Sequence, residues 1–149
     1  MQATRIVAIR HGETAWNVDA RIQGHLDIPL NDTGLWQAQR TASALQAEAL
    51  DAIYCSDLQR AHQTAQALGA SVGLQPITDS GLRERCFGDY EGRTFVEVES
   101  EDPASALRWR KRDPDFVPPG GGESLQMLRS RLLHTIQRLA APHMGGQIA

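Results

Sequence analysis

The sequence predicts an α/β fold with a mainly parallel sheet flanked by helices. Short apolar runs typical of strands alternate with longer segments in which apolar residues recur at helical spacing. In addition, the chain has 149 residues, 41% of them hydrophobic, which is enough to bury one sizeable core. We therefore expect residues 1–149 to form a single domain.

The first strand–helix unit begins near the N-terminus. Residues 5–9 form the first expected strand, and residues 11–14 begin the loop after it. Asn31 is a typical helix N-cap, and the apolar residues that follow it predict one buried helical face. This face comprises Leu35, Ala38, Ala42, Leu45 and Ala49.

A second strand–helix unit follows. Residues 52–55 form the second expected strand. Ser56 and Gln59 have the spacing of a capping box that opens the next helix, and Gly69 is expected to end that helix. Residues 75–78 could form a third, shorter strand.

The strand and helix signals are less regular in the second half of the chain. Thr94 and Glu97 resemble another capping box, Asp102-Pro103 is typical of a helix start, and residues 118–122 must be a loop. The last helix is expected over residues 124–139. Its apolar stripe consists of Leu125, Leu128, Leu132, Ile136 and Leu139.

Composition excludes several classes of partner. The chain has 15 Lys and Arg against 18 Asp and Glu, so its near-balanced charge gives no reason to expect nucleic acid or an anionic membrane surface. No apolar run is long enough to span a membrane, and no signal peptide is recognised at the N-terminus. We expect a cytoplasmic protein, and the oligomeric state stays open.

The two cysteines do not indicate a disulfide framework or a zinc site. Neither Cys55 nor Cys86 has the spacing to a following arginine that a cysteine phosphatase needs. Both are expected to be ordinary packed thiols.

Side chains suited to phosphate chemistry follow the first two strands. A neutral imidazole such as that of His11 can attack phosphorus, and the neighbouring Arg10 can bind phosphate oxygens. Residues 56–60, which include Arg60, follow the second strand. Ligands bind beyond the carboxyl ends of strands in parallel sheets, so both segments should lie at one edge. An exposed histidine beside an exposed arginine is the alternative interpretation of residues 10–14.

Blocks spread over nearly the whole chain strengthen the first interpretation. They comprise Arg10 to Thr14 with Trp16-Asn17; Gln23 to Leu30 with Gly34 and Gln37-Ala38; Ser56 to Ala61 with Thr64-Ala65; Leu82 to Glu84 with Phe87-Gly88 and Glu91-Gly92; and Gly121 to Ser124. In this order they resemble the histidine phosphatase superfamily. The resemblance implies a phosphoglycerate mutase-like fold, a three-layer sandwich with a mainly parallel sheet.

The resemblance also implies a role for each matching residue. His11 would be the phosphorylated nucleophile. Glu84 would protonate the leaving oxygen and then activate water. Arg10, Asn17 and Arg60 would bind the phosphoryl group of a small phosphorylated substrate. Neither a cofactor nor a metal is implied.

Each of these positions also has a plainer interpretation. Arg60 could be an exposed helix arginine, Glu84 part of a charged surface cluster, and Asn17 a turn residue. Residues 109–112, Trp-Arg-Lys-Arg, could bind a substrate carboxylate or a second phosphate, or could be a solvated basic helix end. His25 could line the rim of the pocket or lie in a loop.

The expected function is phosphomonoester hydrolysis through a phosphohistidine intermediate. A phosphoglycerate-type mutase is the first alternative, although the segment between Glu84 and Gly121 looks shorter than in the mutases. A non-catalytic phosphate-binding protein is the second alternative.

The resemblance has one gap at the C-terminus. The family places a second histidine after a strand, and the resemblance implies that residues 147–149 begin this strand. His143 is a poor substitute for that histidine because it follows a helix and a proline. We therefore expect a chain that stops before the second histidine and lacks C-terminal strand residues. Losing such a donor costs about 3–4 kcal/mol in the transition state, a factor of ~10²–10³ in rate. The first strand and the last helix would lack a partner, which predicts an exposed edge, an apolar patch and a tendency to aggregate.

Overall fold

Short parallel strands lie between the helices of the molecule. In the computed structural model, which describes residues 2–149, β1 (Arg5–Ile6) pairs with β4 (Gln147–Ile148). β2 (Tyr54–Cys55) pairs with β3 (Ile77–Thr78). A parallel bridge from Ala52 to β4 joins the two pairs, which gives the order β1-β4-β2-β3. The prediction of a mainly parallel sheet is confirmed.

The expectation that the first strand lacks a partner is wrong. The N–H of Arg5 donates to the carbonyl of Gly146 at 2.9 Å, and the N–H of Val7 donates to that of Ile148 at 2.9 Å. The strand is nevertheless shorter than the predicted residues 5–9, because its pairing with β4 covers only Arg5 and Ile6.

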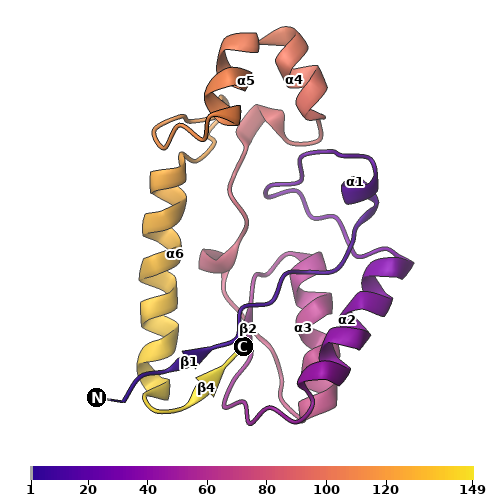
Figure 1. Cartoon of the computed structure of the whole chain (residues 1–149), viewed down its shortest axis with the longest axis vertical. Helices are drawn as coiled ribbons and strands as arrows, with labels where there is room; N and C mark the ends of the chain where they lie inside the picture. Colours follow the sequence, from indigo (N-terminus) through magenta and orange to yellow (C-terminus); the bar gives the residue numbers. More distant parts are fainter. Residues whose placement is uncertain (1) are drawn as a thin grey trace.

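Helices cover both sides of these strands, as Figure 1 shows. α2 (Asp32–Leu45) and α3 (Gln59–Val72) lie on one side, and α6 (Leu125–Ala140) lies on the other. The Asn31 side chain accepts from the N–H of Gly34, and Ser124 caps α6 in the same way. The predicted layered arrangement and both helix starts are confirmed.

The predicted capping box of Ser56 and Gln59 is wrong. Leu58 is the N-cap of α3 and offers no side-chain hydrogen bond. The carboxylate of Asp27 takes over this role, because it accepts from the N–H of Gln59 at 2.7 Å. A residue far away in the sequence therefore caps α3.

Two predicted helix ends also differ from the structure. Gly69 lies buried inside α3, and the helix ends at Gly73, whose φ of 76° suits a glycine C-cap. α2 stops at Leu45 rather than continuing to Ala49. Its buried face consists of small residues, since Leu35 is 42% exposed.

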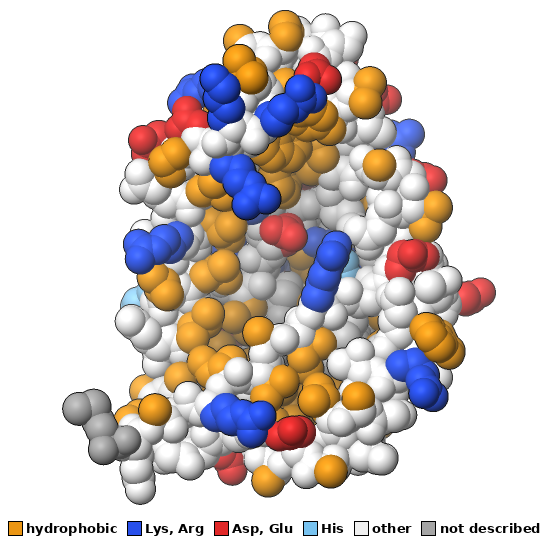
Figure 2. Space-filling model, viewed as in Figure 1, with side chains coloured by type: hydrophobic (Ala, Val, Ile, Leu, Met, Phe, Trp, Pro, Cys, Tyr) orange, Lys and Arg blue, Asp and Glu red, His pale blue; other side chains and the backbone are white. Residues whose placement is uncertain are grey.

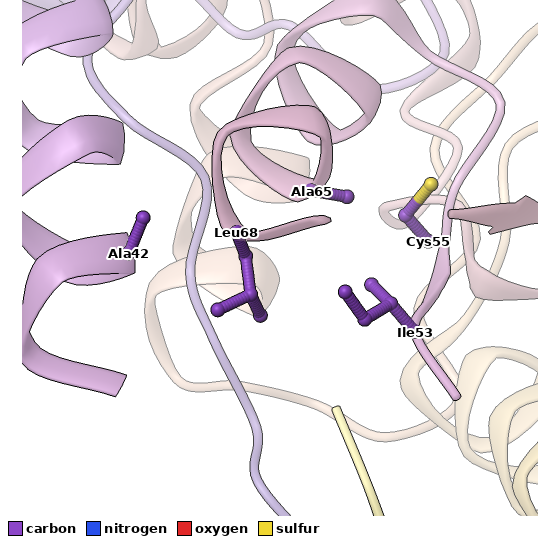
Figure 3. Packing of buried hydrophobic residues seen from close by; sticks show 5 residues of the cluster. All are labelled: Ala42, Ile53, Cys55, Ala65 and Leu68. Atoms are coloured by element: carbon purple, nitrogen blue, oxygen red, sulfur yellow. The ribbon is translucent and has the colours of Figure 1, made fainter. Parts of the chain in front are cut away.

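The main core lies between α2, α3 and the segment around β2 (Figure 3). Its buried members are Ala42, Ile53, Cys55, Ala65 and Leu68. Alanines on both helices leave room for the larger side chains of the strand segment and of α3. Burial raises the pKa of the Cys55 thiol to about 11, as expected of a packed thiol.

A helical cap, residues 87–120, sits at the end of the molecule opposite the chain termini (Figure 1). It contains α4 (Phe95–Glu101) and α5 (Pro103–Arg110). The capping box of Thr94 and Glu97 and the helix start at Asp102-Pro103 are confirmed. The cap has its own buried cluster, which consists of Tyr90, Val98, Ala106 and Phe116.

The two ends of the cap lie side by side. The N–H of Asp89 donates to the carbonyl of Pro119 at 2.8 Å. Just outside the cap, Cys86 and Glu123 exchange two hydrogen bonds: the N–H of Glu123 donates to the Cys86 carbonyl, and the N–H of Cys86 donates to the Glu123 carboxylate. The cap is thus closed at its base.

The remaining elements are short. They are α1 (Ala15–Val18) and the 3₁₀ helices η1 (Ser80–Leu82), η2 (Gly88–Tyr90) and η3 (Ala141–His143). Within residues 2–149, no helix combines the length and apolar character that crossing a membrane requires.

Candidate active site

One cavity of about 650 Å³ contains every side chain that the sequence predicts for the site. These side chains are Arg10, His11, Asn17, Arg60 and Glu84. Figure 2 shows this face hollowed near its centre, with hydrophobic side chains lining the hollow and Lys and Arg side chains around it. The other walls are mainly apolar and come from β1, β2, β4, α3 and α6.

The His11 ring is oriented by its own loop. Its Nδ1 donates to the carbonyl of Gly12 at 2.7 Å, and because a carbonyl can only accept, the neutral ring carries its proton on Nδ1. Nε2 therefore keeps a free lone pair. Burial lowers the pKa of His11 against the opposing hydrogen bond to Gly12, and the positive charges of Arg60 and Arg10 lower it further. The ring is thus neutral, and nucleophilic, at neutral pH.

The loop that carries His11 is held from two helices. The N–H of Gly12 donates to the Thr64 hydroxyl of α3 at 3.1 Å, and the N–H of Glu13 donates to the Gln37 side chain of α2 at 2.8 Å. The backbones of Gly12 and Gly34 touch so closely that a Cβ on either residue would collide with a carbonyl oxygen of the other segment. This contact requires glycine and fixes the position of His11 relative to α2.

Arg60 lies in the first turn of α3 and is only 2% exposed. Its guanidinium donates to the carbonyls of Leu26 at 2.8 Å and Gly24 at 2.7 Å. Burial lowers its pKa, although nearby carboxylates, Glu84 first, act in the opposite direction. The alternative of an exposed helix arginine is therefore wrong. Because the helix N-terminus adds positive potential, this position suits an anion.

Arg10 differs from Arg60, because its side chain is exposed at the mouth of the cavity. It takes part in no hydrogen bond or ion pair within residues 2–149, although it lies close enough to lower the pKa of His11. An exposed arginine here can turn toward an incoming phosphate.

Asn17 has a structural function in addition to its place in the cavity. Its Oδ1 accepts from the N–H of Thr14 at 2.9 Å and from the Thr14 hydroxyl, which closes a capping box on α1. Both the turn interpretation and the cavity interpretation thus describe real features. With the oxygen occupied, the side-chain NH₂ is the group that can donate to a phosphate.

Glu84 is exposed, and its carboxylate accepts from the neighbouring N–H of Arg85 at 2.8 Å. Its backbone is tied down from two sides. The His25 Nε2 donates to the Glu84 carbonyl at 2.8 Å, and Arg131 of α6 donates to it at 3.2 Å. His25 therefore contributes through the loop that carries Glu84.

Sequence reasoning missed Arg131, which connects α6 to this loop. Its Nη1 donates to the carbonyls of Gly81 at 2.8 Å and Arg83 at 2.9 Å. Its Nε and Nη2 bind both carboxylate oxygens of Glu123 at 2.7 Å. Burial acts to raise the pKa of Glu123, but these hydrogen bonds outweigh it and the pKa lies below its ordinary value. No sequence signal marks Arg131, because the backbone carbonyls that it binds lie 47 to 50 positions earlier in the chain.

The other histidines take no part in the cavity wall. His143 forms a hydrogen bond with the Tyr54 hydroxyl at 2.9 Å and does not line the cavity. His62 and His134 lie on α3 and α6 and also do not line it. Among residues 2–149, no group of three or more His, Cys, Asp or Glu side chains is arranged to hold a metal ion. The metal-free mechanism stays a prediction.

Known proteins resemble this chain over nearly its whole length. The family model of the histidine phosphatase superfamily (branch 1) matches residues 6–149. The chain is 44% identical over 145 residues to phosphoglycerate mutase-like protein 4 of Arabidopsis thaliana, which covers 96% of this chain and 63% of that protein. It is 38% identical over 147 residues to glucosyl-3-phosphoglycerate phosphatase of Mycobacterium tuberculosis, which covers 98% of this chain and 66% of that protein.

A solved structure gives the same picture. Bacillus stearothermophilus YhfR superposes with a TM-score of 0.90 at 35% identity, covering 98% of this chain and 72% of that one. The chain therefore spans roughly two thirds of the length of the curated relatives named above, at 63% and 66%.

Proposed function

This chain belongs to the histidine phosphatase superfamily, and on that premise we propose that it hydrolyses phosphate monoesters of small metabolites. The observation that carries the proposal is the neutral His11 ring, whose free Nε2 shares a cavity with two arginines. A nucleophile beside fixed positive charge is the arrangement that phosphoryl transfer needs. The relative named glucosyl-3-phosphoglycerate phosphatase supports this function.

The proposed reaction has two steps. In the first, His11 Nε2 attacks phosphorus, the ester P–O bond breaks, and the Glu84 carboxyl group gives its proton to the leaving oxygen. Arg60, Arg10 and the Asn17 NH₂ group bind the transferring phosphoryl oxygens. Glu84 enters this step as the carboxylic acid.

The second step regenerates the site. Glu84, now a carboxylate, takes a proton from a water molecule, and the resulting nucleophile attacks the phosphorus of phosphohistidine. The P–N bond breaks, inorganic phosphate leaves, and His11 returns to its neutral form. Each proton that Glu84 gives in the first step is recovered in the second.

A phosphoglycerate-type mutase differs only in the acceptor of the phosphoryl group. The name of the relative phosphoglycerate mutase-like protein 4 favours mutase activity as the second candidate function. With 3-phosphoglycerate as substrate, hydrolysis releases inorganic phosphate, whereas a mutase primed with 2,3-bisphosphoglycerate forms 2-phosphoglycerate. We expect phosphate release. The cytoplasmic location stays a prediction.

The decisive experiment follows hydrolysis of phenyl phosphate by the purified chain and by two variants. His11→Ala should abolish turnover, and His134→Ala should not, because His134 is exposed on α6 away from the cavity. Rapid quenching with ³²P-labelled substrate should trap an acid-labile phosphoenzyme in the unmodified chain and none in His11→Ala. Turnover that survives in His11→Ala, or an acid-stable phosphoenzyme, would refute the mechanism.

A further inference from the structure

A second cavity of about 660 Å³ opens next to the first. Glu84, Phe87 and Trp109 line both cavities, so the two meet at the proposed acid. The second cavity lies against the helical cap and the N-terminal end of α6. Its remaining lining comprises Arg85, Phe95, Arg110, Arg112, Leu125 and Leu128.

Trp109 forms a fixed wall where the cavities meet. Its ring stacks on Tyr90 with 5.9 Å between centroids and 5° between planes. Phe87 and Phe95 contact the same ring at 5.2 Å and 5.4 Å between centroids. A ring held by three others loses little further freedom when a ligand packs against it.

The arginines of the second cavity are not equivalent. Arg85 is buried and donates to two backbone carbonyls. Arg110 is paired with Glu99 at 2.7 Å. Arg112 is exposed and takes part in no side-chain hydrogen bond or ion pair with any described residue, 2 to 149.

The backbone of Arg112 is unusual as well, in a conformation that Ala20 is the other described non-glycine residue to adopt. Arg112 has a φ of 53°, in the left-handed region that disfavours residues with a side chain. A glycine would fit this turn without that penalty. The left-handed turn ends α5, because Arg112 follows the C-cap Lys111 and the N–H of Asp113 donates to the carbonyl of Arg108. An arginine at a position where glycine is usual keeps this conformational cost, which motivates a functional hypothesis for its side chain.

From these observations we propose that the second cavity binds the leaving group of the substrate and that Arg112 binds an anionic group on it. This proposal rests on the proposed function, since it places the scissile bond at Glu84. The substrate class is then a phosphomonoester whose leaving group carries an apolar portion beside Trp109 and a distal carboxylate or second phosphate. If residues 109–112 are only a solvated basic helix end, the protein should not distinguish an anionic leaving group from a neutral one.

Binding of non-hydrolysable phosphonates tests this without requiring turnover. Benzylphosphonate and phenylpropylphosphonate would be titrated into the protein by calorimetry, each carrying either a para carboxylate or a neutral para carboxamide. A third set of ligands with a para phosphonate group distinguishes recognition of a carboxylate from recognition of a second phosphate. We expect at least one anionic ligand to bind about tenfold more tightly than its carboxamide, the factor typical of a charge-assisted hydrogen bond. Equal affinities at both spacer lengths would overturn the proposal.

Matched variants locate the effect. Arg112→Gln and Arg112→Gly should both abolish the preference for the anionic ligand. Glycine adopts the positive φ without strain, so a preference lost in Arg112→Gly cannot be attributed to a strained backbone. Lys111→Gln removes the same charge from a residue that does not line the cavity and should keep the preference. A preference that survives in both Arg112 variants, or disappears in Lys111→Gln as well, would refute the assignment to Arg112.

Phenyl phosphate has no distal anion, so its hydrolysis by the unmodified chain tests the proposed function independently of the anion site, and Lys111→Gln, outside both cavities, should leave that hydrolysis unchanged. This separates the two proposals. If the unmodified chain does not hydrolyse phenyl phosphate but shows an Arg112-dependent preference for anionic ligands, the proposed function alone is refuted. If it hydrolyses phenyl phosphate but shows no preference for anionic ligands, the anion site alone is refuted.

Discussion

Replacing Arg131 with methionine should both destabilise the protein and impair proton transfer by Glu84. One guanidinium holds two carboxylate oxygens of Glu123 and the carbonyls of Gly81, Arg83 and Glu84. Methionine fills a similar volume but donates no hydrogen bond, so the carboxylate and the carbonyls lose their partner. The segment that carries Glu84 would then be held to α6 by packing and by the Arg138–Asp79 ion pair at its start.

The size of the effect follows from burial. Breaking a fully buried ion pair costs about 3–5 kcal/mol. The Arg131 and Glu123 side chains are 23% and 14% exposed, so water compensates part of this loss. We expect a loss of roughly 2–3 kcal/mol in the free energy of unfolding, because solvent reaches the unpaired groups only in part. For a chain of this length that corresponds to a fall in Tm of about 4–12 °C.

The catalytic consequence is visible in the leaving-group dependence. 4-Nitrophenolate leaves without help, whereas an alkoxide needs a proton from Glu84. The kcat for an alkyl phosphate should therefore fall by up to ~10², the range of general acid catalysis, while that for 4-nitrophenyl phosphate changes little. Arg138→Met is the matched control, because Arg138 lies on the same helix and pairs with Asp79 in an exposed position.

Either of two results would refute this reasoning. An unchanged Tm in Arg131→Met would mean that the network contributes no stability. A lowered Tm with equal losses for the alkyl and 4-nitrophenyl substrates would mean that Arg131 stabilises the fold without positioning Glu84.

Three further predictions concern other residues. Because burial lowers the pKa of His11, the acid limb of the kcat/KM profile should lie below pH 6.5. The free energy of unfolding should also decline as the pH drops below 6.5, because the unfolded chain binds the proton first. An NMR titration that gives His11 a pKa above 6.5 would contradict this. Arg60→Lys cannot reach both backbone carbonyls and bind phosphate bidentately, so kcat/KM for phenyl phosphate should fall by ~10²–10³. Gly34→Ala should lower the free energy of unfolding in urea by about 1–3 kcal/mol, because its Cβ would collide with the Glu13 carbonyl. Gly73→Ala has open space around it and should cost only about 1–2 kcal/mol, which comes from its positive φ. A Gly34→Ala variant as stable as the unmodified chain would refute the collision.

Local signals explain what could be predicted from the sequence. Asn31, Thr94, Asp102 and Ser124 cap their helices through hydrogen bonds to residues within three positions, so short patterns suffice to find them. The parallel strand arrangement followed from alternation of strands and helices. The predicted site residues lie after these strands, which is why they meet in one cavity.

Contacts between distant residues explain the failures. Asp27 caps α3 across 32 positions, and this replaced the expected capping box of Ser56 and Gln59. The end of α3 at Gly73 rather than Gly69 depends on packing, since Gly69 faces the segment that leads to β3. No local pattern encodes such contacts, and the same holds for Arg131.

The closed base of the cap bears on how new specificities arise in this fold. Because residues 87–120 leave and re-enter the body at adjacent points, a segment of different length can replace them if it keeps the backbone hydrogen bonds of Gly92 and Arg93 to Ile22. Trp109 and Arg112 would travel with it, while His11 and Arg60 would stay. Chimeras that graft foreign caps between Cys86 and Glu123 should therefore change which metabolite is recognised and leave the phosphoryl chemistry intact.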